Sequence, residues 1–198
     1  MFKAFMKEYY QNAILDFRFW SKAKYKIHVD LAKGEYQFLP DSENYNEKRF
    51  TMAYHQINDL LSEFFEKRSE VLIVVNKYMN QRKYNKDLVL HKIIKRFSNS
   101  SLIDGSRFYL SEDKLWVDQL VLQTEWKNVK QYFLIQALIN EDFPDRRPRF
   151  STSSSFYPDI YLLNVKTGVI FHVYDDRGCE IYFKDRRSLK NFEKQKNS

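Results

Sequence analysis

Cysteine, glycine and proline are scarce in this chain of 198 residues, and each scarcity excludes a class of structure. Cys179 is the single cysteine, so no disulfide forms within the chain, and a reducing compartment is the simplest expectation. Four glycines and four prolines are too few for a collagenous, low-complexity or largely disordered chain. The sequence therefore predicts a folded protein that needs no disulfide or metal to hold its core together.

Long apolar runs are also missing. The longest aliphatic run covers residues 71–75, far short of the roughly 20 residues that a membrane-spanning helix requires. The stretch from Met1 to Glu8 lacks the apolar segment of a secretory signal. We therefore expect a cytoplasmic protein that does not enter a membrane. No repeat or Pro/Gly-rich linker divides the chain, so residues 1–198 are expected to form a single domain.

Motifs with a defined chemistry are missing as well. The sequence contains no Cys/His spacing of a zinc site, no glycine-rich phosphate loop and no Gly-x-Ser-x-Gly elbow. Asp159 after Pro158, together with Glu180, resembles part of a metal-dependent nuclease motif, in which two carboxylates hold the ion and a lysine polarises the phosphate. The only candidate lysine, Lys184, stands two positions late. We predict no catalytic residue, no cofactor and no metal, and a hydrolase or nuclease is the least favoured alternative.

Aromatic residues are abundant, with fourteen Tyr and seventeen Phe, and the apolar spacing predicts an α+β fold. Helices are expected over residues 1–12, 46–66, 88–97 and 129–139. Strands are expected near residues 17–19, 25–31, 70–78 and 115–122. Residues 98–105 are expected to form a turn-rich break. We predict an antiparallel or mixed sheet with packed helices.

The last part of the chain predicts a three-stranded meander. Its strands are expected over residues 160–163, 169–174 and 179–183. Gapless pairing across the last turn would place Tyr174 opposite Cys179 and His172 opposite Ile181, so His172 and Cys179 would share an apolar face. Together with Asp175, these two residues could assemble a nucleophile or metal site, but a lone His and a lone Cys on such a face are most often core residues.

Two polar segments supply the candidate binding residues. The first is the turn of the meander, which offers a guanidinium and carboxylates at an exposed tip, although turn chemistry alone explains the same residues. The second is the longest predicted loop, residues 142–155, because binding residues often lie on such loops. The candidate binding residues are Asp175, Asp176, Arg177, Arg146, Arg147 and Arg149.

The formal net charge is +7, and the excess of basic residues is concentrated in two stretches. One runs from Lys77 to Arg96 and the other from Lys184 to Lys196. Solvated helix faces and a loose tail are the plain interpretation of both stretches. The alternative is a nucleic-acid surface, on which Tyr78 and Tyr84 would stack on bases.

Residues 170–180, Ile-Phe-His-Val-Tyr-Asp-Asp-Arg-Gly-Cys-Glu, resemble the signature of the bacterial domain of unknown function 3885, a family from Gram-positive genomes. Residues 15–19, 49–50 and 134–143 resemble further blocks of that family, so the resemblance spans nearly the whole chain. It implies the type of protein and no particular activity. We therefore expect a non-enzymatic protein-binding module, such as a toxin-immunity or regulatory protein, with a protein partner. A charge of +7 suits an acidic partner surface. Nucleic-acid binding is the alternative.

Overall fold

The structure is a computed structural model that describes residues 1–79, 89–95, 101–150 and 157–196. The strands are β1 (Lys26–Asp30), β2 (Glu70–Met79), β3 (Ser101–Leu110), β4 (Leu115–Glu125), β5 (Asp159–Asn164), β6 (Ile170–Asp175) and β7 (Gly178–Tyr182). The helices are α1 (Phe2–Tyr10), α2 (Phe19–Lys22), α3 (Glu47–Phe64), α4 (Val89–Ile93), α5 (Gln131–Ile139) and α6 (Arg186–Lys196), with a 3-10 turn η2 (Trp126–Asn128).

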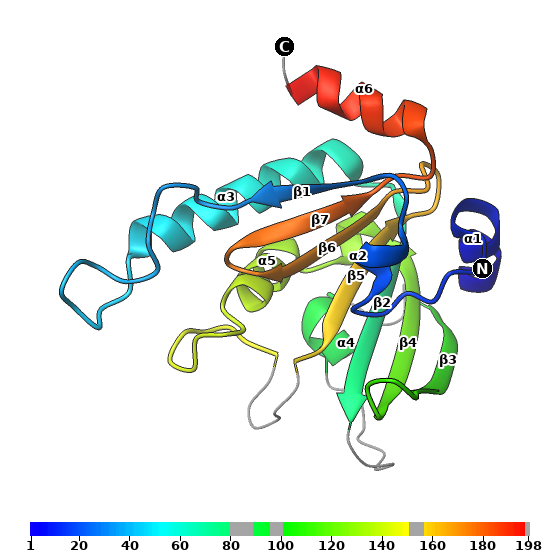
Figure 1. Cartoon of the computed structure of the whole chain (residues 1–198), viewed down its shortest axis with the longest axis horizontal. Coiled ribbons are helices and arrows are strands. Elements are labelled where there is room, and N and C mark those ends of the chain that lie inside the picture. Colours follow the sequence, from blue (N-terminus) through cyan, green and yellow to red (C-terminus); the bar gives the residue numbers. More distant parts are fainter. Residues whose placement is uncertain (80–88, 96–100, 151–156, 197–198) are drawn as a thin grey trace.

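These strands form one seven-stranded antiparallel sheet in the order β1-β7-β6-β5-β2-β4-β3 (Figure 1). Strands β5, β6 and β7 follow one another in both chain and sheet, so they form the expected C-terminal meander. The prediction of an α+β fold with an antiparallel or mixed sheet is confirmed, and the sheet is antiparallel.

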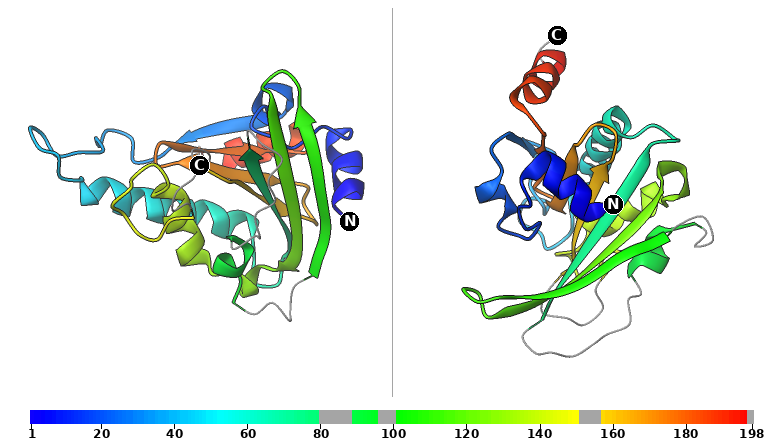
Figure 2. Two further views of the ribbon diagram at one scale, coloured as in Figure 1. Left: turned by 90° about the horizontal axis from the view of Figure 1, so that it is seen from below. Right: turned by 90° about the vertical axis from the view of Figure 1, so that its right-hand side faces the viewer.

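Helix α3 lies on one face of the sheet beside α5 (Figure 2). Its buried side chains recur at spacings of three and four, which places them on one side of the helix. The apolar ones are Phe50, Ala53, Ile57, Leu60 and Leu61. Full burial of such a side chain contributes about 1.5–3 kcal/mol, so this stripe holds α3 firmly on the sheet. The helix predicted over 46–66 is confirmed.

Strand β2 is an inner strand of the sheet, between β4 and β5, and both of its faces are buried. Val71, Ile73 and Val75 belong to the core under α3 and α5. Leu72 and Val74 belong to a second core under α1 and α2. Successive side chains of a strand point to opposite faces, so a strand covered on both faces is continuously apolar. The buried strand predicted over 70–78 is confirmed.

Two local predictions are wrong, and one predicted helix is shorter than expected. The strand expected near 17–19 is replaced by α2, because Asp16 accepts hydrogen bonds from the backbone N–H groups of Arg18 (2.9 Å) and Phe19 (2.8 Å) and thereby starts a turn. The break expected over 98–105 is strand β3 from Ser101 onward, because β4 provides a long-range partner for it; residues 98–100 lie outside the described residues. The helix expected over 88–97 is present as α4 but ends at Ile93, since Ile94 pairs with Val129 in an isolated bridge; residues 88, 96 and 97 lie outside the described residues.

The register of the β6–β7 hairpin also differs from the gapless prediction. Cys179 pairs with Val173, His172 pairs with Glu180, and Tyr174 is the extra residue of a β-bulge. The bulge places His172 and Cys179 on opposite faces of the sheet. Cys179 lies in the core under α3, and His172 faces the side of α1 and α2. Both side chains are buried, as predicted, but they do not share a face.

Candidate functional site

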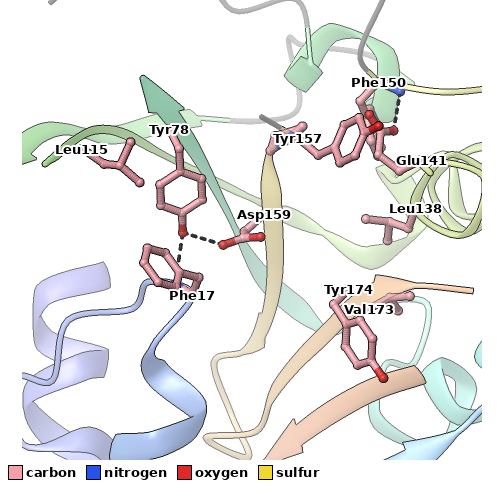
Figure 3. Close-up of a pocket in the computed structure, with 11 residues that line it drawn as sticks. Phe17, Tyr78, Leu115, Leu138, Glu141, Phe150, Tyr157, Asp159, Val173 and Tyr174 are labelled. Carbon is pink, nitrogen blue, oxygen red and sulfur yellow. Dashed lines mark hydrogen bonds between the residues drawn. The ribbon is translucent and has the colours of Figure 1, made fainter. Parts of the chain in front are cut away.

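The sheet splits between β5 and β6. Three residue pairs join these strands, namely Tyr161–His172, Leu162–Phe171 and Leu163–Ile170. Before these pairs β5 continues along β2 alone, and after them β6 continues along β7 alone. A bulge increases local twist and bends its strand, so the bulge in β6 accounts for this divergence. The two strands enclose a cleft of about 380 Å³, the β5–β6 cleft (Figure 3).

Two tyrosine residues line opposite sides of the β5–β6 cleft, and we call these two sides its lips. Tyr157, just before β5, and Tyr174, in the bulge of β6, are 39% and 36% exposed. The ring of Tyr174 stacks on His28, with ring centroids 5.9 Å apart. On the third side, from α5 and the segment that follows it, the lining residues are Leu138, Glu141 and Phe150.

Asp159 lies at the first residue of β5 and lines the cleft. Its Oδ2 accepts a hydrogen bond of 2.5 Å from the hydroxyl of Tyr78, and the Phe17 ring packs edge-on against Tyr78 (Figure 3). Burial and the neighbouring Asp159 carboxylate raise the pKa of Tyr78, so its hydroxyl stays protonated and donates. The nucleic-acid alternative would have Tyr78 stack on bases. Its hydroxyl is instead committed to Asp159.

His172 lies between two carboxylates. Its Nδ1 is 3.5 Å from Glu180 Oε2, its Nε2 is 3.8 Å from Asp159 Oδ1, and its ring stacks on Tyr161 at 4.3 Å. Burial disfavours the charged ring, but Asp159 and Glu180 outweigh burial and raise the pKa of His172 to about 9. A protonated His172 therefore neutralises part of the carboxylate charge beside the cleft.

Glu180 has its own set of partners. Burial works against its charge, but hydrogen bonds from His172 and Tyr182 prevail and lower the pKa of Glu180. Lys184, the late lysine of the incomplete nuclease motif, lies over the ring of Tyr9 instead. Asp159 and Glu180 engage opposite nitrogens of His172, so they do not converge on one ion position. Within the described residues, no group of three His, Cys, Asp or Glu side chains could hold a metal ion.

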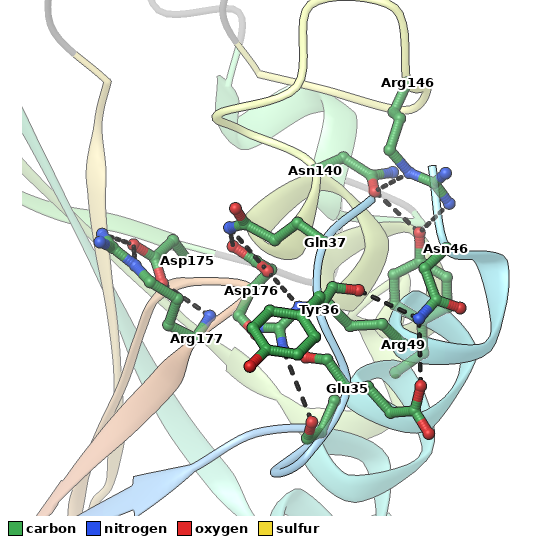
Figure 4. Close-up of polar contacts among 12 residues, drawn as sticks. Glu35, Tyr36, Gln37, Asn46, Arg49, Asn140, Arg146, Asp175, Asp176 and Arg177 are labelled. Atoms are coloured by element: carbon green, nitrogen blue, oxygen red, sulfur yellow. Dashed lines mark hydrogen bonds and ion pairs between the residues drawn. The ribbon is translucent and has the colours of Figure 1, made fainter. Parts of the chain in front are cut away.

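The turn of the meander is a buried anchor rather than an exposed acidic tip. Asp176 is 0% exposed and accepts hydrogen bonds from Arg49 Nε (2.7 Å) and Gln37 Nε2 (3.0 Å) (Figure 4). Asp175 is also buried and accepts from the backbone N–H and Nε of Arg177, both at 2.7 Å. The expectation of exposed carboxylates is wrong, because both complete ion pairs. The Arg177 side chain is 64% exposed.

Sequence reasoning did not assign a role to Arg49. It lies in the first turn of α3 and is buried among the apolar residues of that helix. Its Nη2 also donates to the backbone oxygen of Asp176 at 3.1 Å. A buried cation is costly unless it is paired, so the lone arginine on the apolar side of a helix was the signal that pointed to a distant carboxylate.

The three arginines of the predicted binding loop have different roles. Arg146 is mostly buried and donates to Asn140 (Figure 4). It also donates to Glu47 and lies over the Phe50 ring at 3.7 Å. Its guanidinium therefore fastens the loop to α3. The other two lie nearer the surface. Arg147 is exposed and donates to loop carbonyls, and Arg149 donates to the backbone oxygen of Glu141 at 2.7 Å.

The loop and the turn lie on the two sides of the β5–β6 cleft. Arg149 is 5.9 Å from the ring centroid of Tyr157, and Arg177 follows Tyr174 in the hairpin. Asp142 lies between the segments: burial and Asp175 raise the pKa of Asp142, and Arg177 and Arg149 oppose this shift. The structure thus brings Arg149 and Arg177, which are far apart in the sequence, to one rim.

The basic stretch from Lys77 to Arg96 is described only in part. Lys92 Nζ donates to the backbone oxygen of Phe150 (3.1 Å) and Lys95 Nζ to that of Lys127 (2.7 Å). These two lysines therefore help to hold loops in place. Tyr84 and the basic residues between 80 and 88 lie outside the described residues. In the second basic stretch, α6 exposes Arg186, Arg187 and Lys190.

Comparison with known proteins identifies relatives without an assigned activity. A family model described as "Domain of unknown function (DUF3885)" matches residues 2–198. The uncharacterized protein YnaE of Bacillus subtilis (strain 168) is 28% identical over 194 residues, which cover 94% of this chain and 90% of YnaE. No solved structure matches the chain. Among the described residues, no helix combines the length and apolar character needed to cross a membrane.

Proposed function

The chain belongs to the DUF3885 family, and we propose that it is a non-enzymatic protein-binding module that receives part of a partner protein in the β5–β6 cleft. The main observation behind this proposal is a pair of partly exposed tyrosines, one on each lip of the cleft. Each of these tyrosines lies beside an arginine. Tyr157 lies near Arg149, and Tyr174 precedes Asp175 and Arg177. Tyrosine and arginine are enriched among the residues that dominate binding energy at protein interfaces.

The cleft has the build of a pre-formed binding site. Its walls are apolar and aromatic, and its few polar groups are held by neighbours: Asp159 by Tyr78 and Glu141 by the Phe150 backbone N–H at 3.0 Å. Sites of about this size that combine apolar walls with few fixed polar groups bind ligands with little rearrangement. These hydrogen bonds and ion pairs also disfavour catalysis, since Asp159 and Glu180 each interact with a tyrosine hydroxyl and with His172.

The arginine rim selects the chemistry of the partner. Arg149 and Arg177 lie at the rim of the cleft, and the chain as a whole carries +7. We propose an acidic partner surface with an aromatic or apolar side chain that enters between Tyr157 and Tyr174. A toxin-immunity or regulatory role in the cytoplasm, exerted by residues 1–198 as one domain, is the role that this binding mode supports best.

The test compares lip variants in affinity capture from cells of the source organism, with the full chain as bait. Tyr174→Ala should lose the specific partner, and Arg177→Ala should weaken its recovery, because both remove groups at the lips. Tyr132→Ala is the matched control, since Tyr132 is 71% exposed on α5 and lies outside the cleft lining. Equal recovery of the same protein by wild type, Tyr174→Ala and Tyr132→Ala would refute the proposal.

A further inference from the structure

Strand β1 forms one edge of the sheet, where β7 and β6 separate it from β5. Its register with β7 shows which backbone groups face outward. Leu31 N–H donates to Arg177 O, and Tyr25 O accepts from Phe183 N–H, both at 2.8 Å. Backbone groups alternate in an antiparallel ladder, so those of Lys26, His28 and Asp30 point away from β7. They have no strand partner among the described residues.

A groove of about 500 Å³ runs along this edge, between β1, α3 and α6. Ile27 and Val29 supply its wall on the sheet side, because their side chains face α3. Leu60 of α3 and Phe192 of α6 complete an apolar lining. Figures 1 and 2 show α6 beyond the edge of β1, so the groove has a wall on its outer side as well.

Charged groups line the same groove. Asp59 of α3 is exposed and has no ion pair among the described residues. Lys33 follows β1 at one end of the groove and is likewise exposed, whereas Lys196 is paired with Glu63. The α3 side of the groove therefore presents an uncompensated carboxylate next to apolar surface, and a basic side chain would complement it.

We propose that this groove binds an extended segment of a partner protein, which adds to β1 as an eighth strand. Edge strands accept such segments through main-chain hydrogen bonds, and pockets beside the edge select alternate side chains. The segment would place an apolar residue against Leu60 and Phe192 and a neighbouring basic residue against Asp59. Figures 1 and 2 show α6 beyond this edge, so a second copy of the sheet that paired with β1 would meet α6.

The test uses a random dodecapeptide library displayed on phage and selected against the full chain. Selected peptides should alternate apolar residues and carry Lys or Arg beside one of them. Asp30→Pro removes an outward N–H and leaves the ladder to β7 in place, since proline is tolerated on edge strands where the N–H faces outward. Its affinity for a selected peptide should fall about tenfold, the effect of one lost hydrogen bond. Asp30→Ala is the matched control and should change affinity less than about threefold.

Further measurements distinguish binding at this groove from binding at the β5–β6 cleft. Asp59→Lys should weaken the same peptide, and Tyr174→Ala should leave its binding unchanged, so failure of the cleft proposal and failure of this one are distinguishable. If Asp30→Pro lowers the melting temperature, hydrogen exchange on the wild type decides: the His28 and Asp30 amides should become protected when peptide binds. Lack of peptide enrichment, equal binding by Asp30→Pro and Asp30→Ala, or a concentration-dependent dimer that Asp30→Pro dissociates would each overturn the proposal.

Discussion

The charge of His172 makes the stability of this protein depend on pH in a defined direction. Its pKa is about 9 in the folded chain and 6.5 for an unperturbed histidine. A folded-state pKa above the unfolded value contributes stability that is complete below pH 6.5 and is lost as the pH rises through 9. At 1.36 kcal/mol per pKa unit, the difference corresponds to about 3 kcal/mol at most.

The perturbation that isolates this contribution is His172→Gln, which keeps a polar side chain and removes the titration. Urea unfolding of both proteins at pH values from 6 to 10 gives their free energies of unfolding. The difference between wild type and His172→Gln should shrink by about 3 kcal/mol across this range. Cys179 and the buried tyrosines also titrate at high pH, but they are present in both proteins and cancel in the difference.

Two controls cover the case in which His172→Gln does not fold. Glu180→Gln removes one of the two carboxylates, so the NMR-monitored titration midpoint of His172 should move to lower pH than in wild type. His55→Gln is a matched substitution on α3, outside the pair of carboxylates. A difference between wild type and His172→Gln that stays constant from pH 6 to 10 would refute the assignment, as would a His172 midpoint near 6.5.

Two further predictions concern the meander. Asp176→Ala leaves the Arg49 guanidinium buried without its carboxylate, so it should lower the free energy of unfolding by about 3–5 kcal/mol. Arg177→Ala changes a mostly exposed side chain and should alter that free energy by less than about 1 kcal/mol. Urea unfolding measures both values, and equal effects would contradict the role of Asp176 as a buried anchor. Burial raises the pKa of the Cys179 thiol, so Ellman's reagent should react with it only after urea unfolding, and rapid labelling of the native chain would contradict its position in the core.

Helices and strands whose apolar residues follow a clear pattern within one segment were predictable from the sequence. The apolar stripe of α3 and the β-branched run of β2 depend on side chains within one segment, so their spacing was sufficient. The same holds for the three strands of the meander. Strand β3 was missed because its pairing with β4 overrides the weak strand propensity of Ser101, Gly105 and Ser106.

The candidate site was predictable only in outline. The loop that carries Arg149 and the turn that carries Arg177 were recognised as polar segments, but their shared position around one cleft depends on the packing of the whole sheet. The ion pair between Arg49 and Asp176 joins residues 127 positions apart. Rules for turn residues consider only neighbouring residues, so they do not predict this pair. For this reason the two aspartates of the turn were expected at the surface and are found inside.

The bulge at Tyr174 links these features to one cause. A gapless hairpin would have placed His172 opposite Ile181, whereas the bulge places it opposite Glu180, where its charge is stabilised. The same extra residue bends β6 away from β5, and Tyr174 itself lines the cleft while its ring stacks on His28. The site therefore depends on the register of the hairpin as well as on the motif. Substitutions that restore gapless pairing should remove both the contact of His172 with Glu180 and the cleft.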